Sequence, residues 1–183
     1  MFKKNKVMRL WLMSLATVSM VAQAANNEET LVVTQGVSQE PTAPVNGIVA
    51  TKTLSATKTS AEIVKTPQSV SVITRDQMAM QDVTSVSQAL RYSAGVFTEY
   101  RGSSNRNDEV FVRGFSYVPK FLDGLSFGAT ASSQTGTIDP WLLERVELIR
   151  GPASVLFGQV NPGGLISMTS KRPTSTPVHK VQF

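Results

Sequence analysis

Few residues of this chain have the types and spacing that catalysis requires. His179 is the only histidine and lies close to the last residue, so neither a histidine-based triad nor a histidine metal cluster can be assembled. Residues 158–164 are rich in glycine but lack the Gly-Lys-Ser/Thr ending of a phosphate-binding loop. Asp108, Glu109 and Asp123 are scattered and fit loop or turn positions. The sequence predicts no enzyme, no resident cofactor and no metal site.

A run of charged residues offers ion pairing instead. Glu144, Arg145 and Glu147 are followed by an Arg-Gly-Pro corner at residues 150–152 and by Asn-Pro-Gly-Gly at residues 161–164. On a strand, Arg145 and Glu147 share one face, and the intervening apolar residues share the other. Taken alone, this pattern indicates a half-buried strand with surface ion pairs, which contribute little to stability.

The composition is that of an exported chain without affinity for nucleic acid. Four of its 18 lysines and arginines lie in a basic start that precedes an apolar run and an Ala-Gln-Ala site, as in a cleavable export signal over residues 1–24. Cleavage there leaves 14 basic against 13 acidic side chains, so the formal charge of +5 overstates that of the mature product. A nearly neutral product lacks the basic surface that binds phosphates. Cysteine is absent, so stability must come from packing.

The mature chain divides into a polar leading segment and one globular domain. Residues 25–60 are rich in Thr, Ser, Ala, Asn and Pro without helical periodicity, which predicts a largely disordered or extended linker. Within it lies a β-branched island of the kind that adds to a sheet edge. The island consists of Glu29, Thr30, Leu31, Val32, Val33 and Thr34. Residues 61–175 are dense enough in apolar side chains to build a core, and residues 176–183 begin a new alternating segment.

Alternation and turn signals in residues 61–175 predict an α+β domain, a small mixed sheet with irregular loops. We expect strands within residues 67–74, 96–100, 110–115, 120–125, 146–149 and 165–170. The strands over 110–115 and 120–125 should be joined by a turn and lie inside the sheet, and Asp123-Gly124 is a strong turn dipeptide. Residues 126–136 should form a loop.

Helical segments should be short. Asp82 can cap a helix that carries Val83, Val86 and Leu90 on one face. Asp139, followed by proline, fits the cap of a helical turn, and residues 153–157 can form another.

These segments together resemble the plug domain of TonB-dependent outer-membrane receptors, which take up iron-siderophore complexes. The resemblance rests on the β-branched island, the strand Pro-Gln-Ser-Val-Ser-Val-Ile-Thr, Arg-Gly-Phe, Asp-Gly-Leu, Asp-Pro-Trp-Leu-Leu-Glu-Arg and Asn-Pro-Gly-Gly, in this order. Receptors for ferric hydroxamate siderophores of the ferrichrome and ferrioxamine type look closest. The resemblance implies the plug portion of such a receptor, located in the outer membrane inside a barrel. Residues 176–183 would then start the first barrel strand, and the ferric siderophore would be the transported ligand.

The resemblance also implies roles for single residues. The island of residues 29–34 is similar to the TonB box, which would pair as a strand with the energy-transducing protein TonB. Arg113 and Arg150 match the arginines that hold glutamates on the inner barrel wall, and we name these two residues the candidate latch. Arg101 matches an arginine that hydrogen-bonds iron-hydroxamate oxygens. Tyr117 and Phe127 lie in loops expected to add aromatic surface to the siderophore site.

Two other interpretations stay open at this point. The chain could be a stand-alone periplasmic plug-like protein that binds TonB as a decoy, or a truncated receptor without function. A secreted hydrolase is disfavoured because no nucleophile-base arrangement is present.

Overall fold

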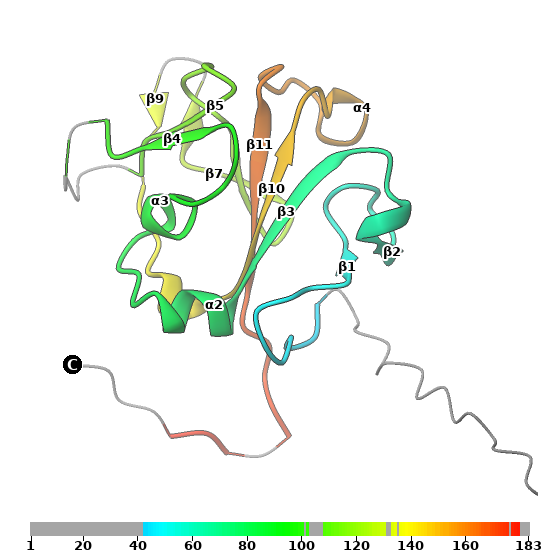
Figure 1. The fold of residues 1–183 in the computed structure, drawn as a ribbon, viewed down its shortest axis with the longest axis vertical. Helices are drawn as coiled ribbons and strands as arrows, with labels where there is room; N and C mark the ends of the chain where they lie inside the picture. Colours follow the sequence, from blue (N-terminus) through cyan, green and yellow to red (C-terminus); the bar gives the residue numbers. More distant parts are fainter. Residues whose placement is uncertain are drawn as a thin grey trace, which may run out of the picture. The chain divides into compact units, whose positions relative to one another are not determined.

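A five-stranded mixed sheet forms the centre of the computed structural model, which describes residues 42–100, 102, 108–130, 133–134, 136–175 and 177–179. The strand order is β3-β10-β11-β6-β7. The strands are β3 (Ser69–Thr74), β10 (Leu143–Arg150), β11 (Gly164–Ser170), β6 (Lys120–Leu122) and β7 (Leu125–Phe127). Pairing is antiparallel except between β11 and β6 (Figure 1). The predicted α+β domain with a small mixed sheet is confirmed.

Short strand pairs surround this sheet in the described part of the chain. They are β1 (Lys52–Thr53) with β2 (Ala61–Glu62), β4 (Val96–Thr98) with β5 (Val110–Val112), and β8 (Ala129–Thr130) with β9 (Ser133–Gln134). The helical segments are η1 (Ile63–Lys65), α2 (Arg75–Met80), α3 (Val86–Ala89), η2 (Pro140–Leu142) and α4 (Ser154–Phe157). Each of these helical segments is short, so packing between elements, more than the helices themselves, fixes where the side chains lie.

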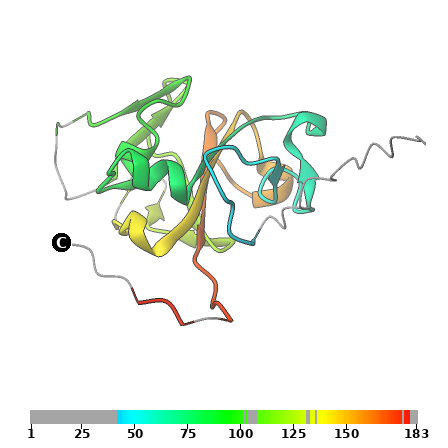
Figure 2. The ribbon, with the colours of Figure 1, turned by 60° about the horizontal axis from the view of Figure 1, so that its bottom comes forward.

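One face of the sheet carries the main apolar core. Val146 and Leu148 of β10 point to this face with Ile166 and Met168 of β11, and all four are fully buried. Helices α2 and α3 and the β4–β5 pair cover this side (Figures 1 and 2). Full burial of each such side chain contributes about 1.5 to 3 kcal/mol. A register shift at the start of β10 turns Leu143 into the same core, where strict alternation would place it on the other face.

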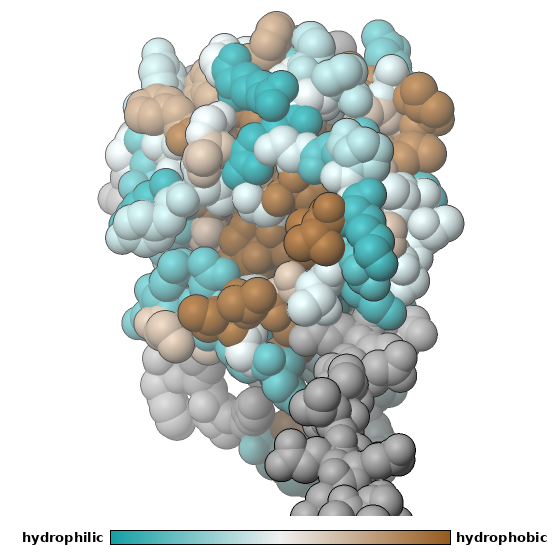
Figure 3. Space-filling model, turned by 45° about the vertical axis from the view of Figure 1, so that its right-hand side comes forward, coloured by the Kyte–Doolittle hydropathy of each residue, from teal (hydrophilic) through white to brown (hydrophobic). Residues whose placement is uncertain are grey.

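The opposite face is covered by residues 42–56, which the composition assigns to the linker. Ala56 packs with Ile149, Ala153 and Leu165 in a second apolar cluster, and Thr53 is fully buried. The segment up to residue 60 is predicted to be largely disordered or extended, but its residues 42–56 are packed against the sheet. The cause is tertiary, because β10 presents charged side chains that bind this polar segment. Apolar and polar side chains intermix at the surface on this side of the unit (Figure 3).

The same packing corrects the expectation for the charged run. Arg145 and Glu147 share a face of β10, as predicted, but each is only 1% exposed, so their ion pair is a buried one. Residues 42–56 shield both side chains from solvent. This charged strip is considered further below.

The helical region differs from the expectation of one helix capped by Asp82. Thr74 caps α2 by accepting a hydrogen bond from Gln77 N, and Ser85 caps α3 in the same way. Asp82 lies between the two helices at φ 48°, a left-handed conformation that aspartate tolerates better than most residues. Val86 and Leu90 are nevertheless fully buried, as the apolar spacing predicts.

Two strand predictions also need correction. The segment over 110–115 is not an inner strand of the sheet, because β5 pairs with β4 instead. Asp123 and Gly124, at φ 50° and 86°, form the turn between β6 and β7, so part of the expected 126–136 loop is strand. The remainder contains the β8–β9 pair. By contrast, Asp139 caps η2 through Trp141 N at 2.8 Å, as predicted.

Candidate functional site

The two arginines of the candidate latch lie next to each other at one end of the sheet. Arg150 is the last residue of β10, and Arg113 follows β5. The Ala94-Gly95 turn holds both residues, since Arg150 Nε donates to Ala94 O at 2.6 Å and Arg113 N donates to Gly95 O at 2.8 Å. The fold thus brings together the Arg-Gly-Phe and Arg-Gly-Pro motifs, which are 37 positions apart in the sequence.

Glycine at position 151 makes room for this arrangement. A Cβ atom built on Gly151 would lie 3.2 Å from a guanidinium nitrogen of Arg113. Gly151 also adopts φ 94°, which side chains other than hydrogen rarely allow. Arg113 itself has φ 54°, a conformation that costs an ordinary residue about 1 to 2 kcal/mol. Backbone strain of this kind concentrates at functional sites.

The pair is electrostatically unbalanced within the described residues. Neither arginine has an acidic partner there, and Arg150 instead uses neutral acceptors, including Ser69 and Ser71 at 3.2 and 2.7 Å. Burial, and then the charge of Arg113, lower the pKa of Arg150 below its ordinary value. Two adjacent cations with free donor capacity can accept a carboxylate or another anion from outside the chain.

A pocket of about 650 Å³ lies beside the Arg113 loop. Its walls come from the loop between β5 and β6, from β6 and β7, and from the end of α4 with the segment that follows it. The lining residues are Gly114, Phe115, Ser116, Tyr117, Pro119, Phe121, Ser126, Phe157, Gln159, Val160 and Asn161. The lining contains aromatic rings and neutral polar groups and no charged side chain. Both its volume and its composition suit a small-molecule ligand.

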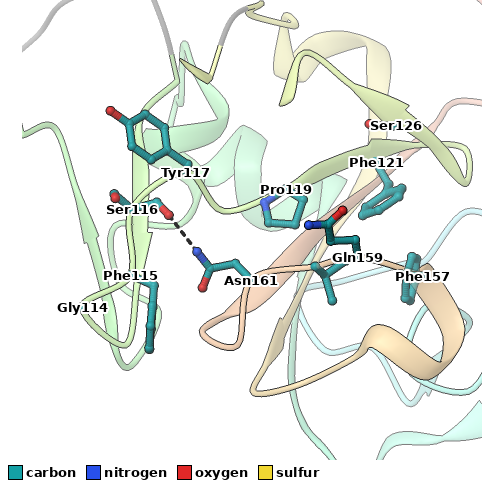
Figure 4. Close-up of a pocket in the computed structure, with 11 residues that line it drawn as sticks. Gly114, Phe115, Ser116, Tyr117, Pro119, Phe121, Ser126, Phe157, Gln159 and Asn161 are labelled. Carbon is teal, nitrogen blue, oxygen red and sulfur yellow. Dashed lines mark hydrogen bonds between the residues drawn. The ribbon is translucent and has the colours of Figure 1, made fainter. Parts of the chain in front are cut away.

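The pocket has an aromatic end formed by two phenylalanines and a mixed end with both aromatic and polar groups. Phe121 and Phe157 face each other with ring centroids 4.8 Å apart, and Tyr117 lies at the other end (Figure 4). Asn161 joins two walls, because its Nδ2 donates to Ser116 O at 3.0 Å while its Oδ1 accepts from Gly163 N. The two loops are therefore held at a fixed separation.

A lysine stands just outside the aromatic end of the pocket. The Nζ atom of Lys58 lies 3.6 Å from the ring centroid of Phe157, a cation–π contact. Partial burial lowers the pKa of Lys58 below its ordinary value of 10.5.

Of the residues predicted to contact the ligand, the structure places Tyr117 in the pocket but not Phe127. Tyr117 lines the pocket at φ 55°, a strained conformation that directs its half-exposed ring. Phe127 is not part of the pocket: it packs against the main core, and its ring lies 3.4 Å from the Cβ position of Gly136. Its neighbour Ser126 reaches the pocket instead, as alternation along β7 requires. Arg101, residues 29–34 and the export signal lie outside the described residues.

Sequence reasoning missed several pocket residues. Phe121 and Phe157 belong to β6 and α4, and nothing local indicates that their rings meet. Asn161 could have been found, because an Asn-Pro-Gly-Gly corner places an amide side chain beside a tight turn. Among the described residues, no cluster of three or more His, Cys, Asp or Glu could hold a metal ion. No helix in the described ranges has the length and apolar character needed to cross a membrane.

The chain is similar in sequence to known siderophore receptors. The chain is 46% identical over 153 residues to the ferrioxamine receptor of Yersinia enterocolitica, a match covering 81% of this chain and 22% of the relative. It is 41% identical over 174 residues to the ferrichrome outer membrane transporter/phage receptor of Escherichia coli K12, covering 91% of this chain and 23% of the relative. The chain therefore spans about a fifth of the length of these relatives.

Solved structures and a family model agree with these relatives. The alcaligin outer membrane receptor FauA of Bordetella pertussis superimposes with a TM-score of 0.62 at 26% identity, covering 75% of this chain and 24% of that one. The pyoverdine receptor FpvA of Pseudomonas aeruginosa PAO1 shares the fold, with a TM-score of 0.64 at 22% identity over 76% of this chain and 21% of that one. The model of the TonB-dependent receptor plug domain matches residues 62–165. This chain belongs to the family of TonB-dependent receptor plug domains.

Proposed function

We propose that this chain is the plug of an outer-membrane receptor that takes up a ferric hydroxamate siderophore with energy supplied through TonB. The observation that carries the proposal is the 46% identity to a ferrioxamine receptor over four fifths of the chain. The similarity to a ferrichrome transporter extends over even more of it. Ligand, barrel and TonB are each supported by a different part of the molecule.

The ligand is supported by the chemistry of the pocket. Three hydroxamate anions balance the charge of one ferric ion, so the chelate needs apolar contact and neutral hydrogen-bonding groups more than a counter-charge. Tyr117, Gln159 and the pocket's phenylalanines provide these. Lys58 lies near the aromatic end, and Arg101 is proposed to contact the iron-hydroxamate oxygens from its own loop. We do not assign Phe127 to the ligand, because it does not line this pocket and its partly buried side chain packs against the core.

The barrel is supported by the candidate latch. Arg113 and Arg150 form a doubly charged site without a carboxylate in the described residues. Glutamates on the inner wall of a barrel would supply the missing charge, and the planar fork of arginine holds a carboxylate through two bonds. Such pairing would bind the plug to the wall at a defined position.

Exposed apolar side chains on the plug also support a surrounding barrel wall. Val64 is 89% exposed and Val155 is 96% exposed, and other apolar side chains reach the surface on the side shown in Figure 3. Single exposed valines are ordinary on soluble proteins. Inside a barrel, however, these side chains would contact the wall and leave water. We propose that they belong to the plug-barrel interface.

TonB would act on residues 29–34. A β-branched segment can pair with a partner's sheet edge through main-chain hydrogen bonds. Coupling to the pocket requires that siderophore binding change the affinity of this segment for TonB. Placing the plug in a receptor also places it in the outer membrane.

Growth on single iron sources tests the proposed function. The gene is deleted and replaced by the wild type or by Tyr117→Asn, and growth is followed with ferrioxamine B or ferrichrome as the only iron source. We expect the wild type to restore growth on at least one of them. Loss of one ring contact in the pocket should weaken siderophore affinity about tenfold, measured by fluorescence quenching of the purified receptor.

Tyr92→Asn is the matched control for this experiment. Tyr92 is well exposed and does not line the pocket, so its loss should leave siderophore affinity unchanged. Asparagine also accepts the left-handed conformation at position 117, so the Tyr117 variant should fold. Undiminished growth of the deletion strain on both siderophores, with no binding by the purified receptor, would refute the proposed function.

A further inference from the structure

Residues 43–55, which we call the strap, are bound to β10 mainly through the charged side chains of that strand. Arg145 donates to Ala43 O at 2.9 Å and to Lys52 O at 3.5 Å. Glu147 Oε2 accepts from Thr53 Oγ1 at 2.7 Å and from Ser55 N at 3.0 Å. Both ends of the strap are therefore tied to two alternate residues of one strand.

The middle of the strap is held at the start of α2 and β10. Glu144 Oε1 accepts from Val45 N at 3.3 Å, and its other oxygen lies 3.4 Å from Arg75. Gly47 N donates to Asp76 at 2.6 Å, and Gly47 O accepts from Thr74 Oγ1 at 2.8 Å. Val45 is buried, but most of these connections are hydrogen bonds to polar or charged side chains.

The charges beneath the strap are incompletely compensated. Arg145 and Glu147 are each 1% exposed, and their ion pair is long, at 3.7 Å between Nη1 and Oε1. Within the described residues, Arg145 Nε and Glu147 Oε1 have no hydrogen-bond partner. Burial lowers the pKa of Arg145 although Glu147 and Glu144 raise it, so desolvation outweighs the neighbouring acids. Burial of Arg145 and Glu147 under the strap is therefore unfavourable, because it removes water from charged groups that lack full hydrogen bonding. Release of the strap would hydrate them again.

The other face of β10 behaves differently. Val146 and Leu148 lie in a continuous apolar core, where separation would expose fully buried aliphatic side chains without any gain in hydration. Opening the strap side hydrates charges, whereas opening the core side exposes hydrocarbon. The two faces of the same strand should therefore separate at very different free energies.

We propose that the strap is a releasable cover, which leaves β10 as a unit while β3, β10 and β11 stay paired, and so uncovers a hydrophilic strip formed by Glu144, Arg145 and Glu147. The strap follows residues 29–34 in the sequence, so tension applied there reaches Ala43 before it reaches the sheet. A part of the plug could then open for a polar ligand without unfolding of the core. The transport role rests on the proposed function, but the release itself does not.

Two matched cysteine reporters test the release in the intact protein. Ser55 in the strap and Ser87 in α3, on the core side of the sheet, are 7% and 8% exposed, and this chain contains no cysteine of its own. Each is replaced separately, as Ser55→Cys or Ser87→Cys, and the rate of thiol labelling by a maleimide reagent is measured under native conditions. Because the two positions are similarly buried, different rates report different opening equilibria. We expect labelling at position 55 to be at least about tenfold faster than at position 87.

Weakening the charged anchor should change only one reporter. Glu147→Gln removes the charge that accepts from Thr53 and Ser55, and it should speed labelling at position 55 by about another tenfold. Labelling at position 87, on the core side, should change less than about twofold. Equal rates for the two reporters, or an equal acceleration of both by Glu147→Gln, would show that the strap opens only with the whole core and would overturn the proposal. The measurement needs neither siderophore nor TonB, so its failure is distinct from a failure to support growth.

Discussion

At the scale of single residues, the two arginines of the candidate latch have the same charge but very different surroundings. Arg150 donates to three separate acceptors, Ala94 O, Ser69 Oγ and Ser71 Oγ. Arg113 is exposed, and the structure shows no hydrogen bond from its guanidinium within the described residues. Arg150 therefore contributes to the stability of the plug, whereas the guanidinium of Arg113 makes no such bonds to the residues that the structure describes.

Lysine substitutions should separate these two roles. Arg150→Lys keeps the charge but cannot reach three spread acceptors, so the free energy of unfolding should fall by about 1 to 3 kcal/mol. Arg113→Lys should change it by less than about 0.5 kcal/mol. Urea-induced unfolding, followed by labelling of the Ser87→Cys reporter, measures both. Equal losses in the two variants would contradict the difference in surroundings.

The site residues show where sequence reasoning stops at this scale. Arg113, Arg150 and Tyr117 stand in motifs or loops whose positions a sequence can specify, and the structure brings Arg113 and Arg150 together and places Tyr117 in the pocket. Phe127 is also aromatic and has the same kind of predicted loop context as Tyr117. Only the alternation of β7 decides that its ring packs against the core, and the sequence predicts no strand there.

At the scale of elements, the Asn-Pro-Gly-Gly corner sets the pairing of β10 with β11. A Cβ atom on Gly164 would lie 2.1 Å from Ile149 O, and one on Gly163 would lie 2.5 Å from Val112 O. The two glycines allow three backbone segments to meet where side chains have no space. The glycines of this motif are therefore structural, while Asn161 spans the pocket walls.

Substitution of Gly164 tests this account. In Gly164→Ala the new Cβ atom clashes with the backbone of Ile149, and alanine rarely adopts the φ of 139° found here. The free energy of unfolding should therefore fall by at least about 3 kcal/mol. Gly158→Ala is the control, because Gly158 also has a positive φ but has nothing within 4 Å of its Cβ position. Its cost should stay near 1 kcal/mol. Urea unfolding of the two variants with similar midpoints would show that close packing at Gly164 is unimportant.

Elements with local signals could be predicted, and those built by distant contacts could not. Alternation specified β10 and β11, and Asp139-Pro140 specified η2, because caps and side-chain periodicity act within a few residues. The strap has no such signal. Its polar composition resembles a linker, and its order comes from Arg145 and Glu147, more than 90 positions further along the chain.

At the scale of the whole folded unit, one buried lysine joins three sheets. Lys120 of β6 is 1% exposed, and its Nζ donates to Asp108 O at 3.0 Å, just before β5, and to Gly136 O at 3.4 Å, just after β9. Burial lowers its pKa below 10.5, although Asp108 and Glu109 partly offset the effect. The connection between the sheets therefore includes a charge that is costly to bury.

The titration of Lys120 should consequently make the free energy of unfolding rise with pH. Between its lowered pKa and 10.5 the unfolded chain holds the proton while the folded chain has released it, so the free energy of unfolding increases with pH in that window. Lys120→Met does not titrate and serves as the reference. The difference in unfolding free energy, wild type minus Lys120→Met, should grow from neutral pH toward pH ~10.5. A flat or falling difference in urea unfolding across that range would contradict the sign.

The antiparallel pairing of β3 with β10 has a consequence for biosynthesis. Arg75 and Glu144, which meet where these strands join, are 69 positions apart, and β3 is made first. At about 5 to 20 residues per second, the ribosome delivers β10 roughly 3 to 14 s after β3. During that interval β3 lacks its partner strand, so its unpaired backbone groups can associate with any extended peptide nearby. A nascent chain of this topology should depend on a holding chaperone until its central strand emerges.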